Sequence, residues 1–183
     1  MGFFKAYDMR GSFGTDFDLD TVFRVGKALP KVVSGGRWLV GRDCRVTSPD
    51  VAAALVAGLR ESGAEVTDLG LCTTPMVYFF TAEDGYDGSV MVTASHNPPS
   101  DNGLKVSSAG ARPVGYANGL DRVEKLVLGT DPTERPFFSG LHPSRHYSRR
   151  AEAIAMQATP TRIEVIPHLP YGFPLSAFPF VMD

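Results

Sequence analysis

Residues 93–105 carry side chains that can act as a nucleophile or hold a phosphoryl group. Ser95, His96 and Asn97 follow an apolar run at 90–92 and precede two prolines. In open parallel sheets, ligands bind beyond the carboxyl ends of the strands. A serine at such a strand end, on a loop stiffened by proline, is therefore a candidate nucleophile or phosphate carrier.

A lysine follows the same loop at a spacing that allows it to return toward the serine. Residues 101–103, Asp-Asn-Gly, are typical of a tight turn, and Lys105 lies in a second apolar run at 104–106. We expect Ser95 and Lys105 to face the same small volume. An ammonium there would neutralise negative charge on a phosphoryl group during transfer.

Alternating strand-like and helix-like segments would position this loop. Strands are expected at 3–7, 37–41, 65–69, 89–92 and 104–106, with a polar turn at 8–11. Helices are expected after Asp18, after Ser48 and Thr74 as caps that each precede a proline, and over 118–128. Because each crossover helix must cover one face of the sheet, residues 1–130 are predicted to form a three-layer α/β/α domain with a mixed, mostly parallel sheet.

The remainder of the chain has a different composition. Residues 131–183 hold eight of the 14 prolines and show no sustained periodicity. Proline disrupts both helices and central strands. We expect an irregular, poorly ordered C-terminal tail there.

Composition excludes several classes of function. The 183 residues carry a net charge of −2 and are 43% hydrophobic, which gives no electrostatic case for a nucleic-acid or membrane partner. No apolar run reaches the roughly 18 residues of a membrane span. Cys44 and Cys72 form no metal or redox pair, so a reduced cytoplasmic protein is expected.

Several motifs together resemble those of a known family. Thr93-Ala94-Ser95-His96-Asn97-Pro98, followed by Asn102-Gly103-Leu104-Lys105, resembles the phosphoserine loop of the α-D-phosphohexomutases, the phosphomannomutase/phosphoglucomutase superfamily. Residues 5–11 resemble the family's N-terminal motif, with Met9 where isoleucine is usual. Residues 40–45 and Thr74-Pro75 with Tyr78 match as well, and are expected to be supporting structure.

This resemblance implies a role for each candidate residue. Ser95 would carry a phosphoryl group and pass it to a hexose 1- or 6-phosphate, giving a bisphosphate that reorients and returns its other phosphoryl group. Lys105 would transfer the proton of the sugar hydroxyl, His96 would assist, and Asn97 would order the loop. Arg10, Arg45 and Lys105 are the cations expected around the phosphoserine. The substrate-binding residues implied are Tyr7, Arg10, Ser95, His96, Asn97 and Lys105.

The resemblance covers about residues 3–130, the first of the family's four domains. The Asp-Gly-Asp-x-Asp-Arg metal loop and the sugar-reading and phosphate-binding loops of the other domains do not occur in the sequence. Mg²⁺ would thus take one ligand from this chain, through phosphorylated Ser95, and a hexose 1,6-bisphosphate would be the activator. Little turnover of a hexose phosphate is expected from the chain alone, and a truncated or frameshifted longer gene would explain its length.

Three alternatives remain open from the residues. The chain could be a non-catalytic α/β module, or one chain of a split mutase that a partner completes. A serine hydrolase is a weaker alternative because no Gly-x-Ser-x-Gly elbow occurs and adjacent Ser95 and His96 are expected to point apart. The acidic run at 83–88 lacks the ligand spacing of a calcium loop and reads as a solvated turn.

Overall fold

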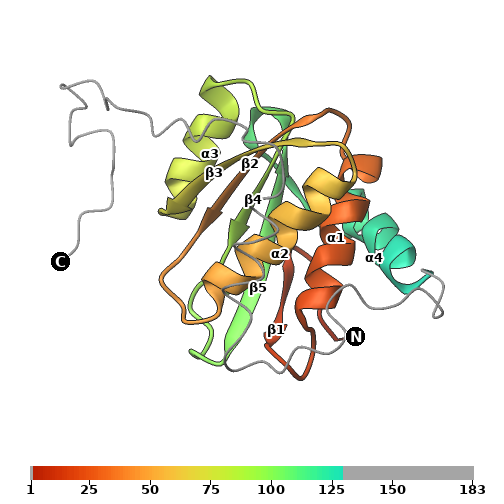
Figure 1. Ribbon diagram of the computed structural model, residues 1–183, viewed down its shortest axis with the longest axis vertical. Coiled ribbons are helices and arrows are strands. Elements are labelled where there is room, and N and C mark those ends of the chain that lie inside the picture. Colours follow the sequence, from red (N-terminus) through yellow and green to blue (C-terminus); the bar gives the residue numbers. More distant parts are fainter. Residues whose placement is uncertain (1, 130–183) are drawn as a thin grey trace.

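The computed structural model describes residues 2–129, which fold into alternating strands and helices (Figure 1). The strands are β1 (Met9–Ser12), β2 (Arg37–Arg42), β3 (Glu65–Leu71), β4 (Gly88–Val92), β5 (Asp101–Ser108) and β6 (Arg112–Val114). The helices are α1 (Leu19–Val32), α2 (Ser48–Glu61), α3 (Thr74–Glu83) and α4 (Leu120–Leu128), with short 3₁₀ turns at Ala109–Ala111 and Tyr116–Asn118. The predicted tail at 131–183 lies outside the described residues.

The six strands form one mixed sheet in the order β1-β5-β4-β2-β3, with β6 also paired to β5. β2 pairs in parallel with both β3 and β4, whereas β5 is antiparallel to β4, β1 and β6. β5 therefore runs against the direction of the other strands, and the predicted mixed sheet is confirmed, with two parallel and three antiparallel pairings. The turn-back from β4 into β5 is the segment that carries Ser95.

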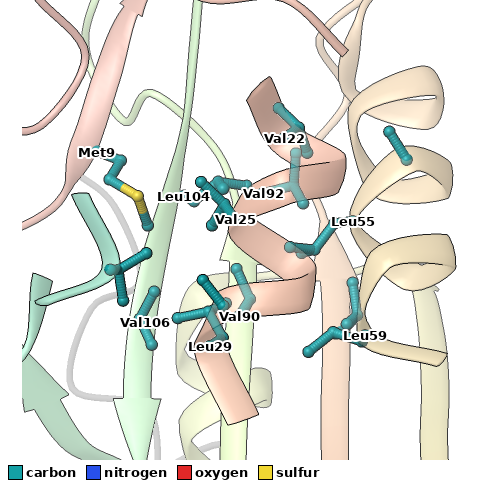
Figure 2. Packing of buried hydrophobic residues seen from close by; sticks show 14 of the residues in the cluster. Met9, Val22, Val25, Leu29, Leu55, Leu59, Val90, Val92, Leu104 and Val106 are labelled. Carbon is teal, nitrogen blue, oxygen red and sulfur yellow. The ribbon is translucent and has the colours of Figure 1, made fainter. Parts of the chain in front are cut away.

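Helices cover both faces of the sheet, which gives the predicted three layers. Figure 1 shows α1 and α2 side by side across one face, with α4 next to α1. On that face, alternate residues of β4 and β5 pack against α1 and α2 (Figure 2). On the other face, Leu39 and Met91 pack with Val77 of α3 and with Tyr86.

Two glycines let α1 and α2 approach closely. A Cβ on Gly58 would meet the carbonyl oxygen of Phe23, and a Cβ on Gly26 would meet that of Leu55. Both contacts would fall on backbone atoms, which cannot rotate away. The two helices are thus packed backbone to backbone and form one layer against the sheet.

Two local predictions are wrong. The first strand starts at Met9 and not at 3–7, because Met9 and Gly11 alternate inward and pair with β5, while residues 5–7 form an exposed turn closed by Lys5 N–H to the Asp8 carbonyl at 2.8 Å. Residues 101–103 are the first residues of β5 and not a tight turn. Gly103 is needed there since a Cβ would meet the carbonyl oxygen of Met9 on the neighbouring strand.

Other expectations agree closely with the structure. Asp18 caps α1, as its carboxylate accepts the Thr21 N–H at 2.8 Å. Ser48 and Thr74 are the first residues of their helices and not the predicted caps, because Thr47 and Thr73 are the N-cap residues; the last helix begins at Leu120. Among residues 2–129, no helix has the length and apolar character needed to cross a bilayer.

Candidate active site

Ser95 lies where the central strand β4 leaves the sheet, and its side chain is exposed. Its backbone adopts φ 57°, in the left-handed region that residues other than glycine rarely occupy. The Thr93 hydroxyl holds this conformation by accepting the Ser95 N–H at 2.9 Å. Such strained backbone persists where the surroundings over-determine it, and it is commonly found at functional sites.

Arg45 fixes the backbone of this loop. Its Nη2 donates to the carbonyl oxygens of Ser95 at 2.8 Å and Asn97 at 2.9 Å, and its Nη1 donates to those of Pro98 at 2.6 Å and Asp101 at 3.0 Å. Its Nε donates to Asp43 at 3.2 Å. A guanidinium has five N–H groups, and five acceptors take them. The expectation that Arg45 faces the phosphoryl group is therefore wrong, because its donors already serve the loop.

A polar cluster at the start of α2 supports Arg45. Asp43 accepts hydrogen bonds from the Arg45 backbone at 3.0 Å and from the Ser48 hydroxyl at 2.5 Å. Burial alone would raise the pKa of Asp43, but the bonds from Ser48, Thr93 and Arg45 outweigh it and hold that pKa below 3.8. Asn102, fully buried, donates to the Thr47 hydroxyl at 2.8 Å and the Ser48 hydroxyl at 3.0 Å. The two ends of the Ser95 loop are thus tied to one helix terminus.

Arg10 and Lys105 meet at a buried carboxylate. Asp8 Oδ1 accepts from Arg10 Nε at 2.8 Å, and its Oδ2 accepts from Arg10 Nη2 and from Lys105 Nζ, the latter at 3.3 Å. The strand register places Arg10 opposite Gly103, so Arg10 and Lys105 share the face of the sheet that α3 covers. Two cations predicted from separate motifs are therefore brought together.

The charge state of Asp8 follows from these partners. Burial alone would raise its pKa, but the hydrogen bonds and charges of Arg10 and Lys105 outweigh burial and hold that pKa below 3.8. The same carboxylate acts on Tyr78 of α3: burial and the Asp8 charge both raise the pKa of its phenol above 10.0. Asp8 is therefore ionised and Tyr78 neutral at pH 7.

Asn97 links the cation pair to the loop. Its Oδ1 accepts from Arg10 Nη1 at 3.3 Å, and its Nδ2 donates to Asp101 at 2.9 Å. Asn97 therefore orders the loop, in agreement with the sequence prediction for it.

His96 and Tyr7 lie at the exposed edge of the site. His96 is exposed, and its Nδ1 lies 3.5 Å from Ser95 Oγ, at the outer limit of a hydrogen bond. The expectation that these adjacent side chains point apart is too strict. Tyr7 sits on the turn before β1 with 86% of its surface exposed.

The described residues do not form a magnesium site. Within 2–129, no group of three or more His, Cys, Asp or Glu side chains is placed to hold a metal ion. The carboxylates nearest the loop already have partners: Asp8 takes Arg10 and Lys105, and Asp101 takes Asn97 and the Ser12 hydroxyl. Mg²⁺ prefers near-octahedral oxygen coordination, which one serine oxygen cannot supply.

Comparison with known proteins decides the family. Residues 1–131 match the phosphoglucomutase/phosphomannomutase, alpha/beta/alpha domain I family. The chain belongs to this family. The predicted kinship with the phosphohexomutases, through their first domain, is thereby confirmed.

Named members of the phosphoglucomutase/phosphomannomutase family show how far the similarity extends. A phosphomannomutase of Klebsiella pneumoniae is 41% identical over 124 residues, which cover 68% of this chain and 79% of that protein. A phosphomannomutase of Escherichia coli is 41% identical over the same length, but the match covers 27% of it. The crystal structure of a phosphoglucomutase/phosphomannomutase family protein from Burkholderia thailandensis aligns with a TM-score of 0.60 and 33% identity, covering 69% of this chain and 30% of that one. The chain thus spans under a third of the longer relatives.

Sequence reasoning missed Asp8 and Asn102 in this domain I. Asp8 was assigned only to a polar turn, and its partner Lys105 lies 97 positions away. The signal that could have identified Asp8 is its carboxylate, two residues from Arg10 in a matching motif. Asn102 also stands in a matching motif, but asparagine before glycine is typical of a turn, so the sequence does not indicate that its side chain is buried and bonded to the start of α2.

Proposed function

We propose that Ser95 carries a phosphoryl group and that this chain is the phosphoserine domain of a phosphohexomutase, which interconverts hexose 1-phosphate and hexose 6-phosphate. The family assignment supports the reaction class. The observation that carries the proposal is the Ser95 loop itself. An exposed hydroxyl stands on left-handed backbone that Arg45 and Thr93 fix. Asn97 of the same loop accepts a hydrogen bond from Arg10, which shares the Asp8 carboxylate with Lys105.

Each step of the transfer has a group that suits it. As the phosphoryl group leaves Ser95, the bond from phosphorus to Oγ breaks and a bond to a sugar oxygen forms. The sugar hydroxyl loses a proton and Ser95 Oγ gains one. We assign both transfers to Lys105: its ammonium gives a proton to the departing Oγ and, once it is an amine, takes the proton of the sugar hydroxyl. Arg10 neutralises charge on the transferring oxygens, since phosphoryl transfer depends mainly on positioning and electrostatic stabilisation.

The remaining residues act at the margin of the transfer. His96, within 3.5 Å of Ser95 Oγ, hydrogen-bonds the phosphoryl group or the sugar. Tyr7 and Asn97 complete the substrate-binding set, Tyr7 through its exposed ring and Asn97 through its bond to Arg10. A hexose 1,6-bisphosphate would load Ser95 and so act as the activator.

Complete turnover needs more than domain I. Because the chain spans 27% of the Escherichia coli phosphomannomutase, we infer that sugar recognition and most magnesium ligands come from outside residues 2–129, whether from a longer chain or from a partner that completes a split mutase. Phosphorylated Ser95 would supply one oxygen to that magnesium. The free cysteines Cys44 and Cys72 suit a reducing cytoplasm, where hexose phosphates are substrates.

Phosphoryl uptake from a hexose 1,6-bisphosphate tests the proposal. The 183-residue chain is incubated with glucose 1,6-bisphosphate, with and without Mg²⁺, and the phosphorylated peptide is located by mass spectrometry. Ser100→Ala, in the same exposed loop, is the matched control for Ser95→Ala. We expect phosphate on Ser95 in the wild type and in Ser100→Ala, and none in Ser95→Ala. Uptake that survives Ser95→Ala, or wild type that takes up none, contradicts the proposal.

A non-catalytic module would behave differently in the same assay. It would take up no phosphoryl group, with or without Mg²⁺, although its loop is ordered. A serine hydrolase would instead react at Ser95 with a fluorophosphonate probe. The three readings are therefore separated by which reagent, if either, modifies Ser95.

A further inference from the structure

Asp8 differs from the other groups of the site in its burial. Its side chain is 4% exposed, whereas those of Arg10 and Lys105 are 24% and 27% exposed. The carboxylate therefore lies beneath the two cations and cannot itself reach a ligand in solvent. The cations keep part of their surface exposed, and Arg10 also donates to Asn97 of the Ser95 loop.

Three elements converge on this carboxylate. Arg10 comes from β1 and Lys105 from β5, and these two cations act on the Asp8 carboxylate, while the Asp8 charge in turn raises the pKa of Tyr78 on α3. Arg10 and Lys105 carry like charges and would separate without an anion between them. Both have long side chains that lose considerable freedom when they are held in one place.

The charge balance of this cluster suits a phosphate ester. Two cations and one carboxylate leave one net positive charge. An arriving phosphoryl group brings about −1.5 to −2. The buried Asp8 carboxylate thus holds the two cations together, and the cluster still keeps a net positive charge.

We propose that Asp8 is a positioning residue, which holds the Arg10 guanidinium and the Lys105 ammonium together on the Ser95 side of the sheet. The effect of Asp8 on phosphoryl transfer rests on the proposed function of Ser95, whereas its contacts with Arg10 and Lys105 do not. Arg10 also donates to Asn97, so the same carboxylate indirectly orients the Ser95 loop. Asp8 touches neither substrate nor phosphoryl group in this role.

A side-chain NMR titration tests the geometry without any phosphoryl transfer. The Arg10 Nε–H and Lys105 Cε resonances of the 183-residue chain are followed as the pH falls. Since one carboxylate contacts both, we expect a step shared by the two signals, with a midpoint below 3.8. Asp8→Asn should remove this step, while Asp121→Asn, which neutralises the partner of the exposed Lys125, should leave it. Separate midpoints, or a shared step that persists in Asp8→Asn, overturn the proposal.

Phosphoryl uptake by Ser95 tests the consequence. With glucose 1,6-bisphosphate as the probe, Asp8→Asn should slow uptake about tenfold or more, the scale of a lost hydrogen bond to a charged group. Asp121→Asn should match wild type. Equal rates in the two variants overturn the role of Asp8. If wild type takes up nothing, the proposed function of Ser95 fails, and the shared titration step alone decides for or against Asp8.

Discussion

Replacing Arg45 with lysine should loosen the Ser95 loop while the rest of the fold persists. The guanidinium supplies five N–H groups to five acceptors, four of them loop carbonyls. A lysine ammonium has three donors and cannot match that planar arrangement. At least two acceptors would lose their partner.

The structure sets the size of the expected loss. The Arg45 side chain is 12% exposed, and the loop carbonyls that it contacts are partly open to water. Each lost bond should therefore cost about 1 kcal/mol, less than the roughly 1.5–3 kcal/mol of a buried bond to a charged group. Arg45→Lys is thus expected to lower the free energy of unfolding by about 2 kcal/mol.

Urea unfolding and amide exchange measure this loss. Trp38 is the single tryptophan and is fully buried, so its fluorescence reports unfolding of the core. Arg24→Lys is the matched control, because Arg24 makes a partly buried pair with Asp20 within α1 that lysine can keep. In Arg45→Lys, the amides of Asn97 and Asp101 should exchange faster, while those of the core follow global unfolding.

Two results would refute this reasoning about Arg45. One is an unfolding free energy within about 0.5 kcal/mol of the Arg24→Lys control, the scale of a surface pair. The other is an unchanged exchange rate across residues 95–101. Either would mean that the loop holds its shape without the guanidinium.

Three further predictions follow from the packing, the backbone and the charges. Gly58→Ala should lower the free energy of unfolding in urea by about 1–3 kcal/mol, because its Cβ meets the Phe23 carbonyl; an unchanged midpoint would show that α1 and α2 can separate freely. Ser95→Gly should raise that free energy by up to about 1 kcal/mol, since glycine tolerates φ 57°, and should abolish phosphoryl uptake; lower stability would mean the serine is unstrained. The folded-state pKa values of Asp8 and Asp43 lie below 3.8, so both stabilise the fold above that pH and lose this contribution as pH falls through the folded values. In an acid titration followed by Trp38 fluorescence, wild type should lose more of its pH 7 stability than Asp8→Asn, which lacks the Asp8 carboxylate. An equal loss of stability in the two chains would count against the ion pairs of Asp8.

The layers and the site position were predictable from local patterns. The apolar run 90–92 followed at once by polar residues marked a buried strand end, and β4 is that strand at the centre of the sheet. Helix positions followed from Asp18 and from prolines at first turns. These features depend on neighbouring residues, so the sequence displays them directly.

The wrong predictions concern residues whose partners are distant in the sequence or are backbone groups. β1 was placed too early because Phe3 and Phe4 are apolar, yet they are buried without forming a strand, while Arg10 and Gly11 pair with β5. The charge of Arg45 suggests a phosphate partner. Its actual partners are backbone carbonyls, which every residue has, so the sequence does not single them out.

The two arginines of the site illustrate why residue type alone does not fix a role. Arg45 is 12% exposed and gives its five N–H groups to Asp43 and the loop backbone, so it acts on Ser95 through the shape of the loop. Arg10 is 24% exposed and, among the described residues, gives three of its N–H groups to Asp8 and Asn97. Donors therefore remain on Arg10 for a phosphoryl group. It follows that phosphoryl uptake in Arg45 variants should fall in proportion to loop disorder, whereas in Arg10 variants it should fall while the loop amides stay protected.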